Sequence, residues 1–285
     1  MAQQNWTKRF GSAPAIPFAS LSPAAGNAGL IVAVSDFDDA LFQSNGTRWR
    51  PLNGHVVLAQ SAVPVGKAPS GSVAANGALT LGTATTEVFS GGIWWLLPAG
   101  AAYAGSAQGV YWCVMSSTTV GTIYDTTYDV TTELPYIPAS PTPIVAAGPG
   151  AYTGLTGNRI VLGTKVPGNA MGIEGLVRAG FKIASNNTAG TKDNTLMING
   201  STASWSTTLS GANVYNSTQV SLQNIGVVNQ QIISRSNATE YFGAMSGIVV
   251  RKTYDTTTDM LVQFALNAIA TDWALIEAIE FVLQA

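Results

Sequence analysis

The stretch LIVAVSDFDDALFQSNGTRWRPLNGHVVL occupies residues 30–58 and shows the pattern that decides the fold. The apolar residues Leu30, Val32 and Val34 stand at every second position, which is the period of one face of a strand. Two turn signals follow, Asn45-Gly46 and Asn53-Gly54, and each Asn-Gly pair supplies the two positive-φ residues of a type I′ hairpin. The stretch therefore predicts a compact β-meander.

The same pattern continues toward the C-terminus. Short β-branched or aromatic runs are separated, about every eight to twelve residues, by Gly, Pro or Asn-Gly, which is typical of β-sandwiches and β-barrels. We therefore predict an all-β protein with three units. Residues 1–60 are a small N-terminal β-meander, 61–165 a middle β domain, and 166–285 a C-terminal jelly-roll-like β-sandwich. Five prolines in residues 133–149 cannot donate ladder hydrogen bonds, so this segment is predicted to be an extended strap.

The last segment, residues 271–285, fits either a strand or a helix. Its Ala, Leu and Glu content favours a helix. Alternation from Met260 to Leu266 just before it favours a strand pair, and we predict a strand. The residues expected on one face of that strand are Leu275, Ile279, Phe281 and Leu283.

Charge is unusually scarce in this chain. Charged residues make up 10% of the 285 residues, against about 25% in an average soluble domain. A folded monomer would carry one charge per roughly 400 Å², compared with about 160 Å² for a typical composition. Such a surface favours association, and it is made tolerable by a cover of uncharged Ser, Thr, Asn and Gln or by burial against identical copies of the chain; we expect both.

Several partners are not expected. The 13 basic residues are scattered and the net charge is −2, which predicts no nucleic-acid binding. The apolar runs are far shorter than the roughly 20 residues that span a bilayer, so we predict no membrane insertion. The polar residues 1–12 lack a signal-peptide core, and we expect synthesis to end in the cytoplasm. Cys113, in an apolar run, is expected to be a buried structural thiol.

Motifs for catalysis and cofactors are also missing. His55 is the single histidine, so no Ser-His-Asp, Cys-His or histidine-based metal site is predicted. Gly66-Lys67 is followed by Ala68, where a phosphate-binding loop needs Ser or Thr. We predict no catalytic residues, no metal and no cofactor.

Paired carboxylates are a separate possibility, because two such groups suffice to hydrolyse a glycosidic bond. The densest acidic clusters are residues 36–39 and the pair Asp255 and Asp259. Both stand where turn residues are expected, so turn roles are favoured. A calcium loop beginning at Asp36 would need Gly and Glu where Leu41 and Thr47 stand.

Three aromatic residues lie among Ser, Thr and Asn: Trp205, Tyr215 and Tyr241. Amphipathic rings in polar loops stack on sugars or fill pockets of partner proteins. We therefore single them out as candidate receptor-binding residues. The alternative is that the rings pack across loops or between subunits.

Much of the middle unit resembles the fibre-type structural proteins of tailed bacteriophages. The stretches that carry this resemblance are APSGSVAANGALTL (68–81), LPAGA (97–101), GSAQGVYWCVMSSTTVGTIY (105–124), IPASPTP (137–143) and GPGAYT (148–153). Residues 171–176, 194–196 and 229–231 are similar to the β-sandwich that ends many such fibres, and residues 44–50 to small modules near their N-termini.

The resemblance implies a non-enzymatic virion structural protein that forms a homotrimer and is assembled in the cytoplasm of the host bacterium. Its expected partners are other virion proteins of the tail, baseplate or capsid, and a glycan or protein receptor on the host surface. The N-terminal part would anchor it, and we assign Trp6, Arg48 and Trp49 to that end.

Two alternatives stay open at this point. The chain shows no heptad or β-helical shaft, so a capsid decoration or head-fibre protein without receptor binding fits as well as a tail fibre. A tailspike-like glycan hydrolase is the second alternative, although no depolymerase pattern is present.

Overall fold

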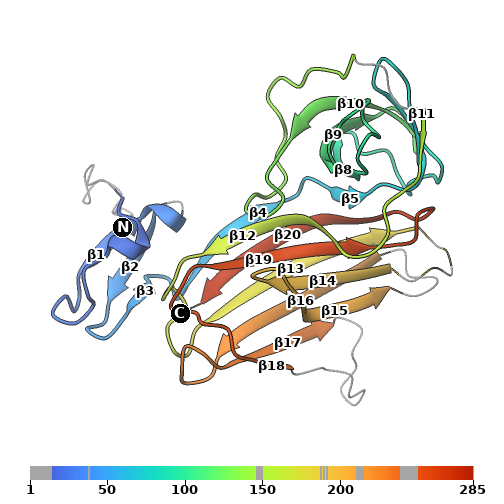
Figure 1. Ribbon diagram of the computed structural model, residues 1–285. Coiled ribbons are helices and arrows are strands. Elements are labelled where there is room, and N and C mark those ends of the chain that lie inside the picture. Colours follow the sequence, from blue (N-terminus) through green and yellow to red (C-terminus); the bar gives the residue numbers. More distant parts are fainter. Residues whose placement is uncertain are drawn as a thin grey trace, which may run out of the picture.

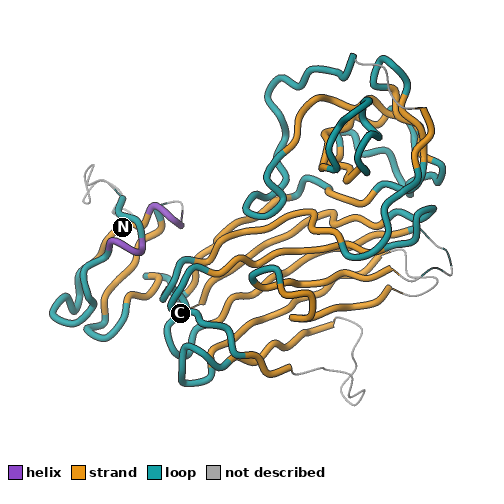
Figure 2. The backbone as a smooth tube through the Cα atoms, viewed as in Figure 1, coloured by secondary structure: helices purple, strands orange, loops and turns teal. Residues whose placement is uncertain are grey.

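The computed structural model describes residues 15–37, 39–145, 150–186, 188, 190, 192–209, 215–237 and 250–284. Strands dominate these residues, as Figure 2 shows, and the predicted all-β class is confirmed. Two 3-10 turns, η2 (Phe18–Ser20) and η3 (Ser35–Phe37), are the helical elements in the described part of the chain.

The N-terminal unit is a three-stranded antiparallel sheet with its own aromatic cluster. Its order is β1 (Ile31–Val34), β2 (Ala40–Ser44) and β3 (Trp49–Pro51). The rings of Phe18, Phe37 and Phe42 lie 5.0 to 5.7 Å apart between centroids. Figure 1 shows the unit beside one end of the large sandwich.

Turn chemistry in this unit differs from the prediction. The type I′ assignment is wrong for both Asn-Gly pairs, because only Gly46 and Gly54 have positive φ. The side chain of Asn45 closes the first turn instead, since its Oδ1 accepts hydrogen bonds from the backbone N–H groups of Thr47 and Arg48, both at 2.9 Å. The strand after Gly54 leaves this sheet altogether.

A two-sheet sandwich forms the centre of the molecule (Figure 1). Its smaller sheet has the order β12 (Arg159–Val166), β19 (Met260–Asn267), β14 (Lys192–Ile198) and β15 (Ser201–Leu209). Its larger sheet contains, in spatial order, β4 (His55–Ser61), β20 (Ala274–Gln284), β13 (Leu176–Ser185), β16 (Tyr215–Asn224), β17 (Gln231–Asn237) and β18 (Val250–Lys252). Phe264 of the smaller sheet contacts Phe181 and Phe281 of the larger one, at 4.6 and 6.0 Å between centroids.

The middle domain continues the larger sheet. Its strands are β11 (Gly150–Tyr152), β6 (Gly71–Val73), β7 (Ala78–Leu81), β10 (Val120–Thr127), β9 (Gly109–Met115), β8 (Ile93–Leu97) and β5 (Val65–Lys67), in that spatial order. Strand β5 pairs in parallel with β8 and antiparallel with β20. One 13-stranded sheet therefore passes through both domains, and β5 is the strand that joins them.

The sheets do not follow the boundaries predicted at residues 60 and 165. Strand β4, from the predicted N-terminal unit, pairs with β20 of the sandwich. Strand β12, from the predicted middle unit, pairs with β19 of the sandwich. The sandwich thus takes strands from all three predicted units.

Strand β20 contributes to two separate cores. The strand predicted at the C-terminus is confirmed, but its predicted single face is not. The pairing of β13 with β20 is irregular between Lys182 and Ile183, which shifts the alternation of β20. Ile279 and Phe281 pack in the sandwich core, whereas Leu275 packs in the core of the middle domain.

Candidate functional site

The structure describes the backbone of two of the three predicted receptor-binding residues, and these two lie in different sheets. Trp205 lies in β15, opposite Leu196 in the smaller sheet, and Tyr215 is the first residue of β16, opposite Ala184 in the larger sheet. Tyr241 lies outside the described residues. The receptor-binding role of these three residues stays a prediction.

The predicted anchoring residues contribute to the N-terminal unit itself. The indole of Trp49 is buried and its Nε1 donates a hydrogen bond of 2.9 Å to the carbonyl of Ser22. Arg48 reaches the sandwich, where a Cβ at Gly172 would lie 3.1 Å from its Nη1. Trp6 lies outside the described residues. An anchoring role for this end of the chain stays a prediction.

The guanidinium of Arg48 does not use all of its hydrogen-bond donors where the N-terminal unit meets the sandwich. Its Nη1 is buried without a hydrogen-bond partner among the described residues. Burial lowers the pKa of Arg48, the charge of Arg50 lowers it further, and Glu174 opposes both effects. Arg48 therefore marks a contact between the two units rather than a free cationic surface.

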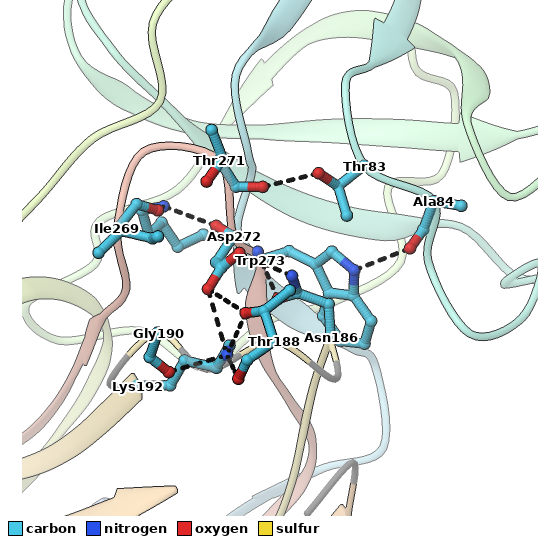
Figure 3. Close-up of polar contacts among 11 residues, drawn as sticks. Thr83, Ala84, Asn186, Thr188, Gly190, Lys192, Ile269, Thr271, Asp272 and Trp273 are labelled. Carbon is cyan, nitrogen blue, oxygen red and sulfur yellow. Dashed lines mark hydrogen bonds and ion pairs between the residues drawn. The ribbon is translucent and has the colours of Figure 1, made fainter. Parts of the chain in front are cut away.

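A buried polar cluster lies at the joint between the middle domain and the sandwich (Figure 3). Lys67 of β5 is fully buried, and its Nζ donates hydrogen bonds to the carbonyls of Ile269, at 2.9 Å, and Asp272, at 2.8 Å. Both carbonyls belong to the loop between β19 and β20. The joining strand is thus tied to the sandwich by its own lysine.

The carboxylate of Asp272 is the centre of this cluster. It accepts hydrogen bonds from Asn186 Nδ2 at 2.8 Å and from the Thr188 hydroxyl at 2.5 Å. It also pairs with the buried Lys192 at 3.2 Å. Figure 3 shows these groups converging on Asp272 from the segment that follows β13. Every oxygen of the carboxylate is therefore used within the protein.

The charges of the cluster influence one another. Burial lowers the pKa of Lys67 to about 8, although the charge of Asp272 opposes the shift. Burial alone would raise the pKa of Asp272, but hydrogen bonds from Thr188, Asn186 and Lys192 outweigh it and hold that pKa below its usual range. An ionised Asp272 beside two lysines is therefore the stable arrangement at neutral pH.

Close packing fixes the same joint. The indole Nε1 of Trp273 donates a 2.9 Å hydrogen bond to the carbonyl of Ala84 in the middle domain. A Cβ at Gly66 would lie 2.7 Å from Cβ of Leu275 and 2.8 Å from the carbonyl of Ala274, so β5 needs a glycine there. The cluster is buried and internally paired, and we interpret it as the element that fixes one domain on the other.

Of the acidic residues singled out from the sequence, Asp255 serves a local turn, as predicted, whereas Asp259 contacts residues distant in sequence. Asp255 Oδ1 accepts hydrogen bonds from the backbone N–H and the hydroxyl of Thr257, at 2.9 and 2.6 Å. Asp259 pairs with Lys165 at 2.5 Å and accepts a 3.0 Å hydrogen bond from the N–H of Gly168. These contacts lower the pKa of both carboxyl groups, which is opposite to what a general acid needs.

A different carboxylate pair, Glu87 and Glu277, was missed in the sequence. Burial raises the pKa of Glu277, the charge of Glu87 raises it further, and Lys182 opposes the shift. The two glutamates are distant in sequence, so no spacing argument could have paired them. Glu277 lies in β20, within the irregular part of its pairing with β13.

Glu87 also lines a cavity of about 320 Å³, which we call the Val88–Ile137 pocket. Its walls are the loop 87–92 of the middle domain, the linker 62–64 between β4 and β5, and Ile137 of the proline-rich strap. Val88 and Ile137 are 44% and 64% exposed, whereas Phe89 is buried in the wall. An exposed apolar rim around a hollow is a feature of surfaces that bind partners.

The strap that carries Ile137 is held on the protein by side chains from both domains. Trp94 Nε1 donates a 2.7 Å hydrogen bond to the carbonyl of Tyr136, and Ser61 Oγ a 2.8 Å bond to that of Pro135. Residues 133–142 belong to no strand or helix. The pocket is therefore built on a fixed backbone although one wall is a loop.

The remaining groups to consider among the described residues are the thiol of Cys113 and possible metal ligands. Burial raises the pKa of the Cys113 thiol, which agrees with the predicted structural role. In the described ranges, no three or more His, Cys, Asp and Glu side chains gather where a metal ion would be held. The part of the chain that the structure describes also has no helix long and apolar enough to cross a membrane.

Comparisons with known proteins add little. No protein family matches the chain, and no curated sequence is significantly similar to it. Among solved structures, lectin UEA-II in complex with galactose shares 8% identity, over 61% of this chain and 90% of the lectin, with a TM-score of 0.27. Arcelin-5, a lectin-like defense protein from Phaseolus vulgaris, shares 6% identity over 81% and 98% of the two chains, with a TM-score of 0.28. Likeness at this level carries no argument about function.

Proposed function

We propose that the protein is a non-enzymatic structural protein of a bacteriophage virion, a homotrimeric fibre or appendage that takes part in attachment to the host surface. The assignment to a virion rests on the sequence resemblance of residues 68–153, and the observation that supports adhesion is the exposed apolar rim of the Val88–Ile137 pocket on a surface with few charges. Adhesion through such surfaces needs shape and apolar area rather than reactive groups.

The architecture suits a part that bears load. The 13-stranded sheet is continuous between the middle domain and the sandwich, and the buried Asp272 cluster holds the connection. Figure 1 shows the N-terminal unit and the middle domain at different ends of the sandwich. An appendage anchored through its N-terminal unit would therefore present the middle domain away from its attachment point.

The proposal places the protein in the virion after assembly in the host bacterial cytoplasm, in contact with tail, baseplate or capsid proteins. Its direct test is electron microscopy of intact particles with a gold-labelled antibody against the purified protein. We expect label at one position on every particle, at the tail or on the head. Particles without label would contradict the proposal.

Attachment is tested separately with purified protein and host cells. If the protein binds the receptor, an excess of it should reduce adsorption of particles in proportion to its concentration. Labelled particles together with unchanged adsorption would support the alternative of a capsid decoration protein.

Glycan hydrolysis is the second candidate, and Glu87 with Glu277 is the observation that favours it. Glycosidases use a carboxylic acid of raised pKa together with a second carboxylate, and the raised pKa of Glu277, to which the charge of Glu87 at the pocket contributes, matches the first of these requirements. Incubation with host polysaccharide tests it. Oligosaccharides released by the wild type but not by Glu277→Gln would establish an enzyme and overturn the non-enzymatic proposal.

A further inference from the structure

We propose that Lys192 and Asn186 become joined by an isopeptide bond inside the joint, with Asp272 as the group that transfers the proton. The new bond is an amide between Nζ of Lys192 and Cγ of Asn186. The inference goes beyond the proposed function, because it concerns how the chain strengthens itself, wherever the protein acts. It rests on an amine, a carboxamide and a carboxyl group that are buried together.

The carboxylate of Asp272 contacts both of the groups that would react. Nδ2 of Asn186 donates a 2.8 Å hydrogen bond to its Oδ1, and Nζ of Lys192 lies 3.2 Å from its Oδ2. Figure 3 shows the two side chains directed at Asp272. Reactants that are held on one small group have a high effective concentration, so this reaction needs no external catalyst.

The site is closed to water. The side chains of Lys192 and Asp272 are 1% and 3% exposed, and Asn186 is buried. Burial keeps water from competing with the amine for the carboxamide carbon. It also makes proton transfer within the pair easier, because the two charges have lost their hydration.

The carboxamide of Asn186 is held at both of its ends. The backbone N–H of Trp273 donates a 3.1 Å hydrogen bond to its Oδ1, while its Nδ2 is held by Asp272. Attack on a carboxamide carbon moves negative charge onto the oxygen, and a fixed backbone N–H stabilises that charge. The donor of Trp273 therefore stands where the reaction needs it.

Thr188 and Gly190 position the amine. Nζ of Lys192 donates hydrogen bonds to the hydroxyl of Thr188, at 2.8 Å, and to the carbonyl of Gly190, at 3.0 Å. A Cβ at Gly190 would lie 2.6 Å from Oδ2 of Asp272, so a glycine is needed for this close approach to the carboxylate. These contacts keep the amine beside Asp272 before the bond forms.

The reaction balances without an oxidant or a cofactor. The ammonium of Lys192 gives one proton to the carboxylate of Asp272, and the resulting amine attacks Cγ of Asn186. Asp272 passes its proton to Nδ2 and takes one from the attacking nitrogen, the Cγ–Nδ2 bond breaks, and ammonia leaves. Ammonia takes the remaining proton as ammonium, so Asp272 is a carboxylate again. Because the ion pair is the stable form at neutral pH, the bond should form slowly after folding.

The bond would fasten the two sheets to each other beside the middle domain. Asn186 directly follows β13 of the larger sheet, and Lys192 is the first residue of β14 in the smaller sheet. A covalent link at this point would resist separation of the sheets where the joint transmits force from the middle domain.

The experiment is high-resolution mass spectrometry of the purified full chain, incubated at neutral pH until its mass no longer changes. We expect a mass about 17 Da below that of the sequence, which is the mass of the ammonia lost. Trypsin should fail to cleave after Lys192 and should release residues 183–235 as one peptide with the same deficit. Fragment ions should place the link between Lys192 and Asn186.

Three variants test the assigned roles. Lys192→Arg keeps the charge but has no amine that can attack, Asn186→Ala removes the carboxamide, and Asp272→Ala removes the proton carrier, so each should have the full mass of its sequence. Lys165→Arg is the matched control, because Lys165 pairs with Asp259 at the surface, and it should keep the deficit. Thermal unfolding checks that each variant is folded, and where Asp272→Ala is not folded, Lys192→Arg and Asn186→Ala decide.

The full sequence mass in folded wild type would overturn the inference. A deficit that persists in Lys192→Arg would also overturn it, and would indicate a succinimide at Asn199-Gly200, which loses ammonia as well. A deficit of about 18 Da, the mass of water, would show that Asp272 rather than Asn186 supplied the acyl group. None of these results bears on the proposed function, which fails through the absence of antibody label on particles.

Discussion

The joint around Asp272 and the pocket around Ile137 use their side chains in opposite ways. At the joint, polar and charged groups are buried and nearly every one has a partner inside the protein. At the pocket, the apolar side chains of Val88 and Ile137 are exposed to solvent. Both regions lie along the middle domain, but one buries polar groups and the other exposes apolar ones.

The difference separates residues that hold the two domains together from residues that are free to contact a partner. Satisfied buried polar groups fix a unique geometry, because any alternative arrangement would leave a charge or a donor unpaired. Exposed apolar groups fix nothing until a partner covers them. Changes at the joint should therefore alter the free energy of unfolding, and changes at the pocket should alter association.

The largest effect is expected from Asp272→Ala, which leaves Lys192 buried without its counter-charge. We expect the free energy of unfolding to fall by about 3–5 kcal/mol, measured by urea denaturation. Asp259→Ala is the control, since it breaks an exposed pair with Lys165 and should cost about 0–1 kcal/mol. Equal losses in the two variants would show that the joint is no more important than a surface ion pair.

Gly66→Ala tests the packing of the joint without changing its charges. The new Cβ would press on Leu275, so we expect a loss of about 1–3 kcal/mol in the same assay. The matched control is Gly180→Ala in β13, where nothing lies within 4 Å of the new atom. If both variants have the stability of the wild type, β5 is not tightly packed between the domains.

An effect that depends on pH is expected from the titration of Lys67. Its folded pKa of about 8 is lower than the value near 10.4 expected in the unfolded chain. Between these pH values the unfolded chain binds more protons, so the contribution of Lys67 to the free energy of unfolding rises with pH. The wild type should therefore gain stability relative to Lys67→Met from about pH 8 to 10.4. A constant difference would contradict the lowered pKa.

The smallest effect on stability is expected at the rim of the pocket. Val88→Ser removes an exposed side chain and should change the free energy of unfolding by no more than about 0.5 kcal/mol. Its neighbour Phe89 is the contrast, because Phe89→Ala empties the buried wall of the pocket and should destabilise the fold by several times as much. Similar losses for the two residues would show that Val88 is part of the core.

Local patterns in the sequence were sufficient to predict the strands but not to predict which strands pair with each other. Alternation after Met260 predicted β19 and the strand after it, although the structure buries residues on both faces of β19. No such signal tells β4 to pair with β20 rather than with β3. The irregular pairing near Ile183 was equally invisible, since it depends on how two distant strands meet.

The functional surfaces were harder to predict for the same reason. Lys67 was noticed as part of a failed phosphate-binding motif, yet its role comes from carbonyls about two hundred residues away. The pocket combines three segments that only folding brings together. The proline-rich strap was the one local clue, because prolines indicate a segment that stays extended at an edge or between units.

The native mass of the purified full chain tests the central claim most directly, that this lightly charged β-protein covers its exposed apolar surface with identical copies. At micromolar concentration we expect a closed multimer of the 29.5 kDa chain, with three copies as the main species. A single 29.5 kDa species at the same concentration, with its fold intact, would contradict the account.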